Sequence, residues 1–366
     1  MSAAPWQSLH LYYFDKKKDA LFLDCLRPLR DELARRGAEA LFFERHWRGG
    51  PHVRIRFRAE DDAFRGELFP MIDAHVHAFL AVHPSRRVLD EATARAQHEL
   101  LAAFELDAEP YTPLRADNSL ELVPYAPSLQ LYRAAAAVAL MEDFSVASVP
   151  LLFDIVAASR DDQSARMAIA MRLLLAYADG LAGIERGYLF CRSYLEKYLG
   201  TGTPDPEAAR AKFRAAYEAR REAVQAIIAG TAADLASGAP SDPILAQWRA
   251  LHGDYAARAR TLIDAGVPLA WGPDSARQLD TSIWTTKFWQ HKTEYLERMY
   301  ANDALRARMN GGAFHQTHMV LVNYLYRLLA AAGITGGEKF VLFALVAYGV
   351  EEAYGIEPLE RVAERP

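Results

Sequence analysis

The sequence predicts an α+β protein in which a small N-terminal α/β layer is fused to a large, mostly helical body. Strand-like alternation of apolar and polar residues is confined to residues 1–130, whereas long helical patterns dominate residues 131–366. Of the 366 residues, 51% are hydrophobic, which is enough to bury a large core. We therefore expect these two parts, 1–130 and 131–366, to form one cooperative unit.

The N-terminal layer is expected to begin with a strand, a helix and a second strand. The pattern predicts a strand at 6–14, a helix at 19–36 that ends at Gly37, and a strand at 40–44. A turn rich in glycine and proline follows at 46–51. It leads into a third strand at 51–58.

This third strand is the most informative stretch of the chain. Its alternation places Val53, Ile55 and Phe57 on one face and His52, Arg54, Arg56 and Arg58 on the other. A half-buried strand with a solvated basic face would show the same pattern. The functional interpretation is a cationic face in which His52, Arg54 and Arg56 bind an anionic or peptide substrate.

Helical signals organise the second part. Asp205 and Pro206 suit the start of a helix that is expected to run from 207 to 228 and to end at Gly230. Segments 199–204, 237–241 and 271–273 are rich in residues that interrupt regular structure, so we expect joints there.

Two C-terminal segments carry the candidate chemistry. In the first, 281–295, a helix would place polar and aromatic side chains along one side. These are Trp284, Lys287, His291 and Tyr295, with Ser282 in the first turn. An aromatic packing stripe with polar tips explains the pattern as well as a peptide groove does.

The second segment, 311–323, is expected to start a helix after Gly312. His315 and His318 would then lie one turn apart, with Gln316 between them. Histidine exchanges a proton near neutral pH, so the pair suits proton transfer next to an amide, although a satisfied core histidine is the alternative. No third ligand stands at a spacing that would indicate zinc.

Composition excludes several classes of function. The net charge of −5 gives no basic footprint for nucleic acid, and two cysteines fit a reducing compartment. The N-terminus shows no secretion signal, and no apolar run reaches the roughly 18 residues that span a bilayer. Without nucleotide-binding glycine motifs or metal spacings, we expect a cytoplasmic protein that uses no cofactor, no metal and no membrane. The Ala-rich helical body is compatible with a homodimer.

Several stretches resemble one known family. The start Leu11-Tyr-Tyr-Phe14, the strand end Phe42-Phe-Glu-Arg-His-Trp47 and the strand 51–57 are similar to the C-terminal domain of lantibiotic dehydratases. That domain also occurs free-standing among thiopeptide biosynthesis proteins. Segments 125–133, 141–148 and 318–323 follow the family pattern loosely, without its mid-chain Gly-Gly pair.

The resemblance implies a substrate and two reactions. The substrate is a ribosomally made precursor peptide that carries a leader. Elimination domains of the family remove glutamate from glutamyl-Ser or glutamyl-Thr esters, for which Arg54, Arg56 and His318 would supply cations and a base. Free-standing relatives join two dehydroalanines into a pyridine-type ring and release the leader, for which Trp284, Tyr295, His315 and His318 would line the groove.

The missing Gly-Gly pair, the free-standing chain and the aromatic, histidine-rich C-terminal segments favour ring formation. The alternatives are a glutamate-eliminating lyase and a non-catalytic carrier that adds a leader peptide to the edge of the sheet.

Overall fold

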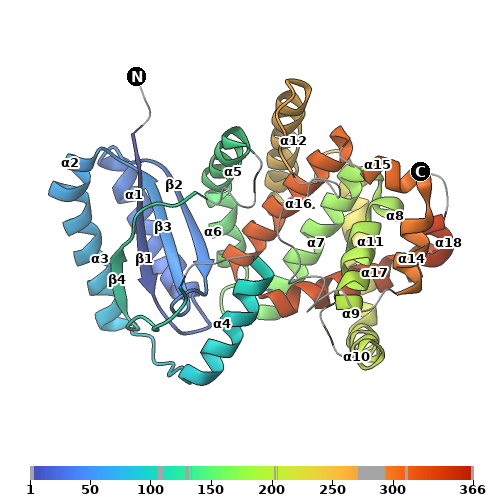
Figure 1. Cartoon of the computed structure of the whole chain (residues 1–366), viewed down its shortest axis with the longest axis horizontal. Helices are drawn as coiled ribbons and strands as arrows, with labels where there is room; N and C mark the ends of the chain where they lie inside the picture. The colour runs from blue at the N-terminus through green and yellow to red at the C-terminus, as the bar shows by residue number, and fades with distance from the viewer. Residues whose placement is uncertain are drawn as a thin grey trace. The chain divides into compact units, whose positions relative to one another are not determined.

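The computed structural model describes residues 4–105, 110–127, 132, 134–201, 203, 205–270, 293–309 and 312–363. Its fold class is the predicted one, a small antiparallel sheet near the N-terminus and a mostly helical remainder (Figure 1). The chain divides into two compact units. The first comprises Met1–Ser128, Met141–Gln163 and Tyr326–Gly333, and the second comprises Leu129–Leu140, Ser164–Leu325 and Ile334–Pro366.

The first unit is built on a four-stranded antiparallel sheet with the strand order β2-β3-β1-β4. The strands are β1 (Trp6–Tyr12), β2 (Glu39–His46), β3 (His52–Arg58) and β4 (Ser119–Leu122). The three strands expected from the sequence are present at these places. Sequence patterns did not predict β4, because its four residues are too short to show a period.

One face of this sheet is the core of the first unit. Val53, Ile55 and Phe57 on β3 are fully buried, as their alternation predicted. Helices lie beside the sheet in Figure 1, and aromatic rings join them to it: Phe57 lies 5.8 Å from Phe64, and Phe43 lies 6.1 Å from Phe22. The helices of this unit are η1 (Leu21–Leu26) and η2 (Phe64–Leu68), both π-helical, and α1 (Arg27–Arg35), α2 (Asp61–Ala63), α3 (Phe69–Val82), α4 (Glu91–Glu105) and α6 (Val149–Ala158).

The turn between β2 and β3 needs its two glycines. Gly49 and Gly50 have φ values of +71° and +115°, which L side chains rarely adopt. A Cβ atom on Gly50 would also lie 2.6 Å from the ring of Phe14. The glycines therefore let β3 turn back against β2 with His52 at its first position.

The second unit is helical and packs around one buried helix. Residues 342–350 of α17 (Gly336–Tyr354) are all buried, and α9, α10 and α11 pack against this helix. A helix that is apolar on all sides belongs in a core. The other helices of this unit are α7 (Gln163–Ala182), α8 (Ile184–Gly187), α9 (Leu189–Thr201), α10 (Pro206–Glu218), α11 (Arg221–Ala236), α12 (Pro243–Asp264), α14 (Glu294–Ala301), α15 (Asp303–Met309) and α18 (Pro358–Ala363), while α5 (Ala135–Ala147) and α16 (Ala313–Ala332) contribute residues to both units.

The prediction of a single helix at 207–228 was wrong. Asp205 caps a helix as expected, accepting a hydrogen bond from Ala208 N, but that helix ends at Glu218 and a second one starts at Arg221. Tyr217 on α10 and Ile228 on α11 are both buried, and both helices pack on α17. The break lets each helix follow α17 separately.

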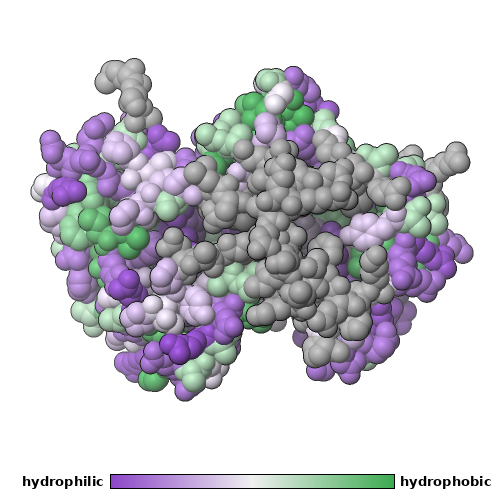
Figure 2. Space-filling view, in the orientation of Figure 1, coloured by the Kyte–Doolittle hydropathy of each residue, from purple (hydrophilic) through white to green (hydrophobic). Residues whose placement is uncertain are grey.

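In Figure 2, hydrophilic residues are interspersed with hydrophobic ones over the visible face of the described chain. Across the described ranges, no individual helix has the length and apolar character to cross a membrane; two bent pairs, α5 with α6 and α7 with the segment 184–200, pass on length and composition alone.

Candidate functional site

The polar face of β3 carries the candidate binding residues of the first unit. Directly opposed residues of an antiparallel sheet share a face. Arg54 therefore lies between His10 of β1 and Glu44 of β2, while Arg56 lies between Ser8 and Phe42. These neighbours decide how much positive charge the face presents.

Arg56 is an internally paired cation. Its side chain is 5% exposed, and Nη1 lies 2.7 Å from Oε2 of Glu44. The guanidinium also lies 4.9 Å from the ring centre of Tyr125, and the other oxygen of Glu44 accepts a hydrogen bond from Arg327. Burial lowers the pKa of Arg56. An incoming carboxylate would have to displace Glu44 to reach this charge.

His52 carries no charge at neutral pH. Burial lowers its pKa to about 3, and the pKa of His10, whose ring stacks on it at 4.6 Å, falls to about 2 for the same reason. Nδ1 of His52 lies 2.9 Å from the carbonyl oxygen of Gly50, and Nε of Arg54 donates to Nε2 of His52 over 3.4 Å. His52 thus orients Arg54 rather than adding to the positive charge.

His318 is the best-defined candidate in the second unit. It lies on α16 one turn after His315, as the spacing predicted. The hydroxyl of Tyr177, a fully buried residue of α7, lies 2.7 Å from Nδ1 and 3.0 Å from the carbonyl oxygen of His318. Burial, with smaller effects of His315 and Lys197, lowers the pKa of His318 to about 4. The ring is therefore neutral near pH 7.

These two contacts select one tautomer of His318. The carbonyl oxygen can only accept, so the single proton of the Tyr177 hydroxyl goes to it. The hydroxyl oxygen must then accept from Nδ1–H, which leaves the lone pair on Nε2. His318 is partly exposed, and Phe314, itself 38% exposed, stacks beside it at 6.5 Å. Nε2 is thus set up as a proton acceptor beside an aromatic surface.

His315 and Gln316, the other candidates on this segment, have surroundings typical of residues that stabilise the fold. His315 is 8% exposed. The side-chain oxygen of Gln316 accepts a hydrogen bond from Leu269 N over 3.0 Å and so fixes the chain that follows α12. Gln316 therefore holds the backbone at Leu269 in place.

Tyr295 lies in a buried cluster on α14. It is 2% exposed, and it packs with Leu296, Met299 and Val362. Its hydroxyl lies 3.3 Å from Oγ of Ser193, and burial raises its pKa to about 12. Tyr295 thus joins α14 to α9, whereas the Tyr177–His318 pair joins α7 to α16.

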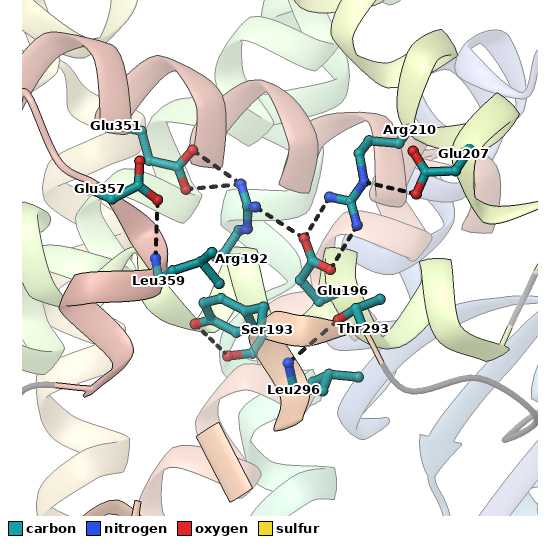
Figure 3. A network of polar contacts seen from close by, with 11 residues as sticks. Arg192, Ser193, Glu196, Glu207, Arg210, Thr293, Leu296, Glu351, Glu357 and Leu359 are labelled. Atoms are coloured by element: carbon teal, nitrogen blue, oxygen red, sulfur yellow. Dashed lines mark hydrogen bonds and ion pairs between the residues drawn. The ribbon is translucent and has the colours of Figure 1, made fainter. Parts of the chain in front are cut away.

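Figure 3 shows a buried ion network around Arg192, whose guanidinium lies 5.6 Å from the ring centre of Tyr295. Arg192 bridges Glu351 and Glu196 at 3.0 Å each, and Arg210 binds both carboxylate oxygens of Glu196 at 2.9 and 3.1 Å. Glu196 is 1% exposed, and its pKa is lowered by its two arginines although burial opposes them. Burial instead raises the pKa of Glu351 to about 7. The network ties together α9, α10 and α17.

A family model described as lantibiotic biosynthesis dehydratase C-term matches residues 6–345. The chain belongs to this family. Membership in the lantibiotic dehydratase C-terminal family connects the protein with the enzymatic biosynthesis of ribosomally made, modified peptides.

Two solved structures of related fold cover nearly the whole chain. The pyridine synthase TbtD, from thiomuracin biosynthesis, is 24% identical, with a TM-score of 0.73 over 96% of this chain and 99% of that one. TsrL is 20% identical, with a TM-score of 0.72 over 99% of both chains. They share the fold of this family member. No curated protein matched the sequence.

Four predicted site residues of this family member, Ser282, Trp284, Lys287 and His291, lie outside the described residues. Sequence reasoning missed Tyr177, because it is surrounded by an apolar helical run and its partner is 141 residues away. It also missed the ion network, although Arg192 and Glu196 stand at a spacing of four that favours pairing on a helix.

Proposed function

We propose that the protein forms a pyridine-type six-membered nitrogen ring by formal [4+2] union of two dehydroalanines in a leader-bearing peptide. The observation that carries this proposal is the neutral, hydrogen-bonded Tyr177–His318 pair, with Nε2 as a proton acceptor. The shared fold with a pyridine synthase over the whole chain supports it.

The reaction needs a proton shuttle more than a strong base. One dehydroalanine amide must become its iminol tautomer, which moves the N–H proton to the amide oxygen. Nε2 of His318 takes the proton from nitrogen, and because its pKa is about 4 it returns the proton readily to oxygen. Two new bonds then close the ring, and loss of water and of the leader as an amide makes it aromatic.

The protein must also hold the two alkenes together. Holding two reacting groups in a near-attack arrangement can contribute ~7 to 11 kcal/mol. We assign this task to the part of the second unit around His318. The sequence-predicted residues Ser282, Trp284, Lys287 and His291 stay candidates for it, while the structure shows Tyr295 packed in a buried cluster. Arg54, oriented by His52, would engage the peptide, with Arg56 fixed beside it.

The surroundings of Arg56 make glutamate elimination the weaker candidate. That reaction needs cations free to bind the leaving glutamate. Arg56 already has the carboxylate of Glu44 at 2.7 Å, and Arg58 has that of Glu142 at 3.7 Å. A leaving glutamate would have to compete with these internal carboxylates for Arg56 and Arg58.

Mass spectrometry separates these functions. A leader-bearing peptide with several dehydroalanines, and its glutamylated precursor, are each incubated with the purified protein alone. Ring formation predicts release of the leader as an amide and a core lighter by one further water. Loss of glutamate alone would establish elimination, and unchanged masses with retained binding would establish a carrier.

Substitutions test whether His318 carries the activity. His318→Ala should abolish turnover and leave peptide binding intact, because the proton acceptor is lost while Arg54, which we propose engages the peptide, remains in place. His77→Ala, at an exposed position of α3, is the control and should leave turnover unchanged. Equal turnover of both variants would remove His318 from the mechanism.

A further inference from the structure

The first unit contains a pocket that the proposed reaction does not use. It has a volume of about 380 Å³, which is in the range of peptide and small-ligand sites. One wall is the loop after α3, with Arg86, Arg87, Val88 and Leu89. Leu114 and Asp117, just before β4, and Phe14, just after β1, also line it.

Hydrogen bonds hold the walls of this pocket in place. Ser85 N donates to Oδ1 of Asn118 over 2.7 Å, and the amide nitrogen of Asn118 donates to the carbonyl oxygen of Ser85 over 2.9 Å. Oγ of Ser85 also accepts from Asp15 N over 3.0 Å. Because loop, strand end and turn are tied together, a ligand would find the pocket preformed.

The pocket has an excess of available positive charge. Its one acid, Asp117, accepts from the backbone N–H groups of Phe14 and Asn118 at 2.9 Å each, so its charge is already engaged. Arg86 lines the pocket and is exposed, and Lys16 and Lys17 are exposed in the chain that follows Phe14. Asp15 lies next to them, and its carboxylate oxygens accept from the backbone N–H of Arg86 at 3.3 and 3.4 Å. Within the described ranges, the side chains of these three cations make no ion pair or hydrogen bond.

Apolar side chains accompany the cations. Val88 is 91% exposed, and Leu89 and Leu114 are partly exposed. An exposed valine and the exposed cationic side chain of Arg86 in one pocket favour a ligand with both a carboxylate and an apolar group.

We infer that this pocket docks an acidic, apolar-anchored segment of the substrate's leader peptide. An apolar side chain of the leader packs on Val88 and Leu114, and its carboxylates lie near Arg86 and Arg87. The inference rests on the proposed function for the presence of a leader. It adds the chemistry that recognises the leader and the place where it binds.

Fluorescence anisotropy tests the docking without any turnover. The probe is a fluorescein-labelled synthetic peptide that alternates pairs of Glu with single Leu residues. Matched probes carry Lys for Glu or Ser for Leu. Wild-type protein should bind the Glu/Leu probe best, and added salt should weaken this binding. Equal affinity for all three probes would overturn the inference.

Charge reversal locates the site. Arg86→Glu, and the double variant with Arg87→Glu, should weaken binding of the Glu/Leu probe by about tenfold or more and should strengthen binding of the Lys/Leu probe. The gain for the Lys/Leu probe excludes simple unfolding. Arg65→Glu on η2, at the opposite end of α3, is the matched control and should change neither affinity. A loss of the same size in the control would overturn the assignment.

Turnover of the dehydroalanine peptide separates this inference from the proposed function. If both hold, Arg86→Glu raises KM and leaves kcat unchanged, because the docking residues do not touch the reacting atoms. Unchanged KM with normal turnover would overturn docking and leave ring formation standing. Charge-dependent probe binding without any turnover would do the reverse.

Discussion

Buried neutral imidazoles recur in the polar interior of this protein. Burial lowers the pKa of His10, His52, His252 and His318 to between about 2 and about 4. A neutral ring offers one acceptor and one donor, and its partners fix which nitrogen is which. At His318 the partner is Tyr177, so this hydroxyl controls the form of the candidate base.

The first prediction concerns Tyr177. Tyr177→Phe removes the acceptor for Nδ1–H, so His318 can adopt the tautomer with a protonated Nε2. We expect kcat to fall roughly a hundredfold with little change in KM. Tyr188→Phe is the matched control, since Tyr188 is buried and its hydroxyl has no hydrogen-bond partner among the described residues. The comparison of kcat for the two variants decides the point, and equal values would refute the role of Tyr177.

The second prediction concerns pH and stability. The pKa of His318 is about 4 in the folded state and 6.5 as the ordinary value, so between these pH values the unfolded chain binds a proton that the folded chain does not. Its contribution to stability is complete above pH 6.5 and falls with pH, by about 1.4 kcal/mol at about pH 5.5. His318→Gln should lose less stability than wild type on this acidification, as measured by urea denaturation. An equal loss in both proteins would contradict the assignment.

At the level of elements, α17 is held by close approach on one side and by ion pairs on another. A Cβ atom on Gly349 would lie 2.6 Å from Cδ1 of Ile228 and 2.7 Å from Cγ1 of Val224, both on α11. On α9, Arg192 pairs with Glu196 of its own helix and with Glu351 of α17. Both kinds of contact are accessible to single substitutions.

The third prediction uses two glycines. Gly349→Ala should destabilise the protein by about 1 to 3 kcal/mol, because α11 must move to make room. Gly230→Ala, at an exposed position of α11 with nothing within 4 Å, should instead stabilise it by about 0.5 to 1 kcal/mol. Chemical denaturation measures both, and shifts of the same sign would contradict the proposed packing.

The fourth prediction uses two glutamates of the network in Figure 3. Glu196→Gln should cost about 3 kcal/mol, because it removes the charge that two buried or half-buried arginines share. Glu351→Gln should cost less than about 1 kcal/mol at neutral pH, since a pKa raised to about 7 means that burial already favours the uncharged form. Denaturation of both variants at neutral pH gives the comparison. A larger cost at Glu351 would show that its ion pair outweighs burial.

At the scale of the whole molecule, the chain passes between its two units several times. Each unit is assembled from three separate segments, and α5 and α16 contribute residues to both. If one unit unfolded, α5 and α16 would each lose the part that lies in that unit, and the part in the other unit would be left without its continuation.

The fifth prediction follows from this connectivity. We propose that the units unfold together, and that hydrogen exchange in increasing urea gives coincident transitions for peptides from β3 and from α17. The measurement uses the wild-type protein and needs no substitution. Two separated transitions would show that each unit is stable by itself.

The sequence by itself determined the local elements and the family. Alternation in β3 identified its buried and polar faces, Asp205 marked a helix start, and the stretch 40–58 pointed to the lantibiotic dehydratase C-terminal family. These features depend on periodicity and on neighbouring residues, which a sequence displays directly. The same local signals failed at 207–228, where packing on α17 breaks the helix.

Only the tertiary structure decided which charges are available and which protons are in place. Glu44 neutralises Arg56, burial removes the charge of His52, and Tyr177 sets the tautomer of His318. Each of these effects comes from a partner or from burial that sequence spacing does not encode, because it depends on which elements pack together. Electrostatic roles are set by such surroundings, whereas secondary structure is set largely by local pattern.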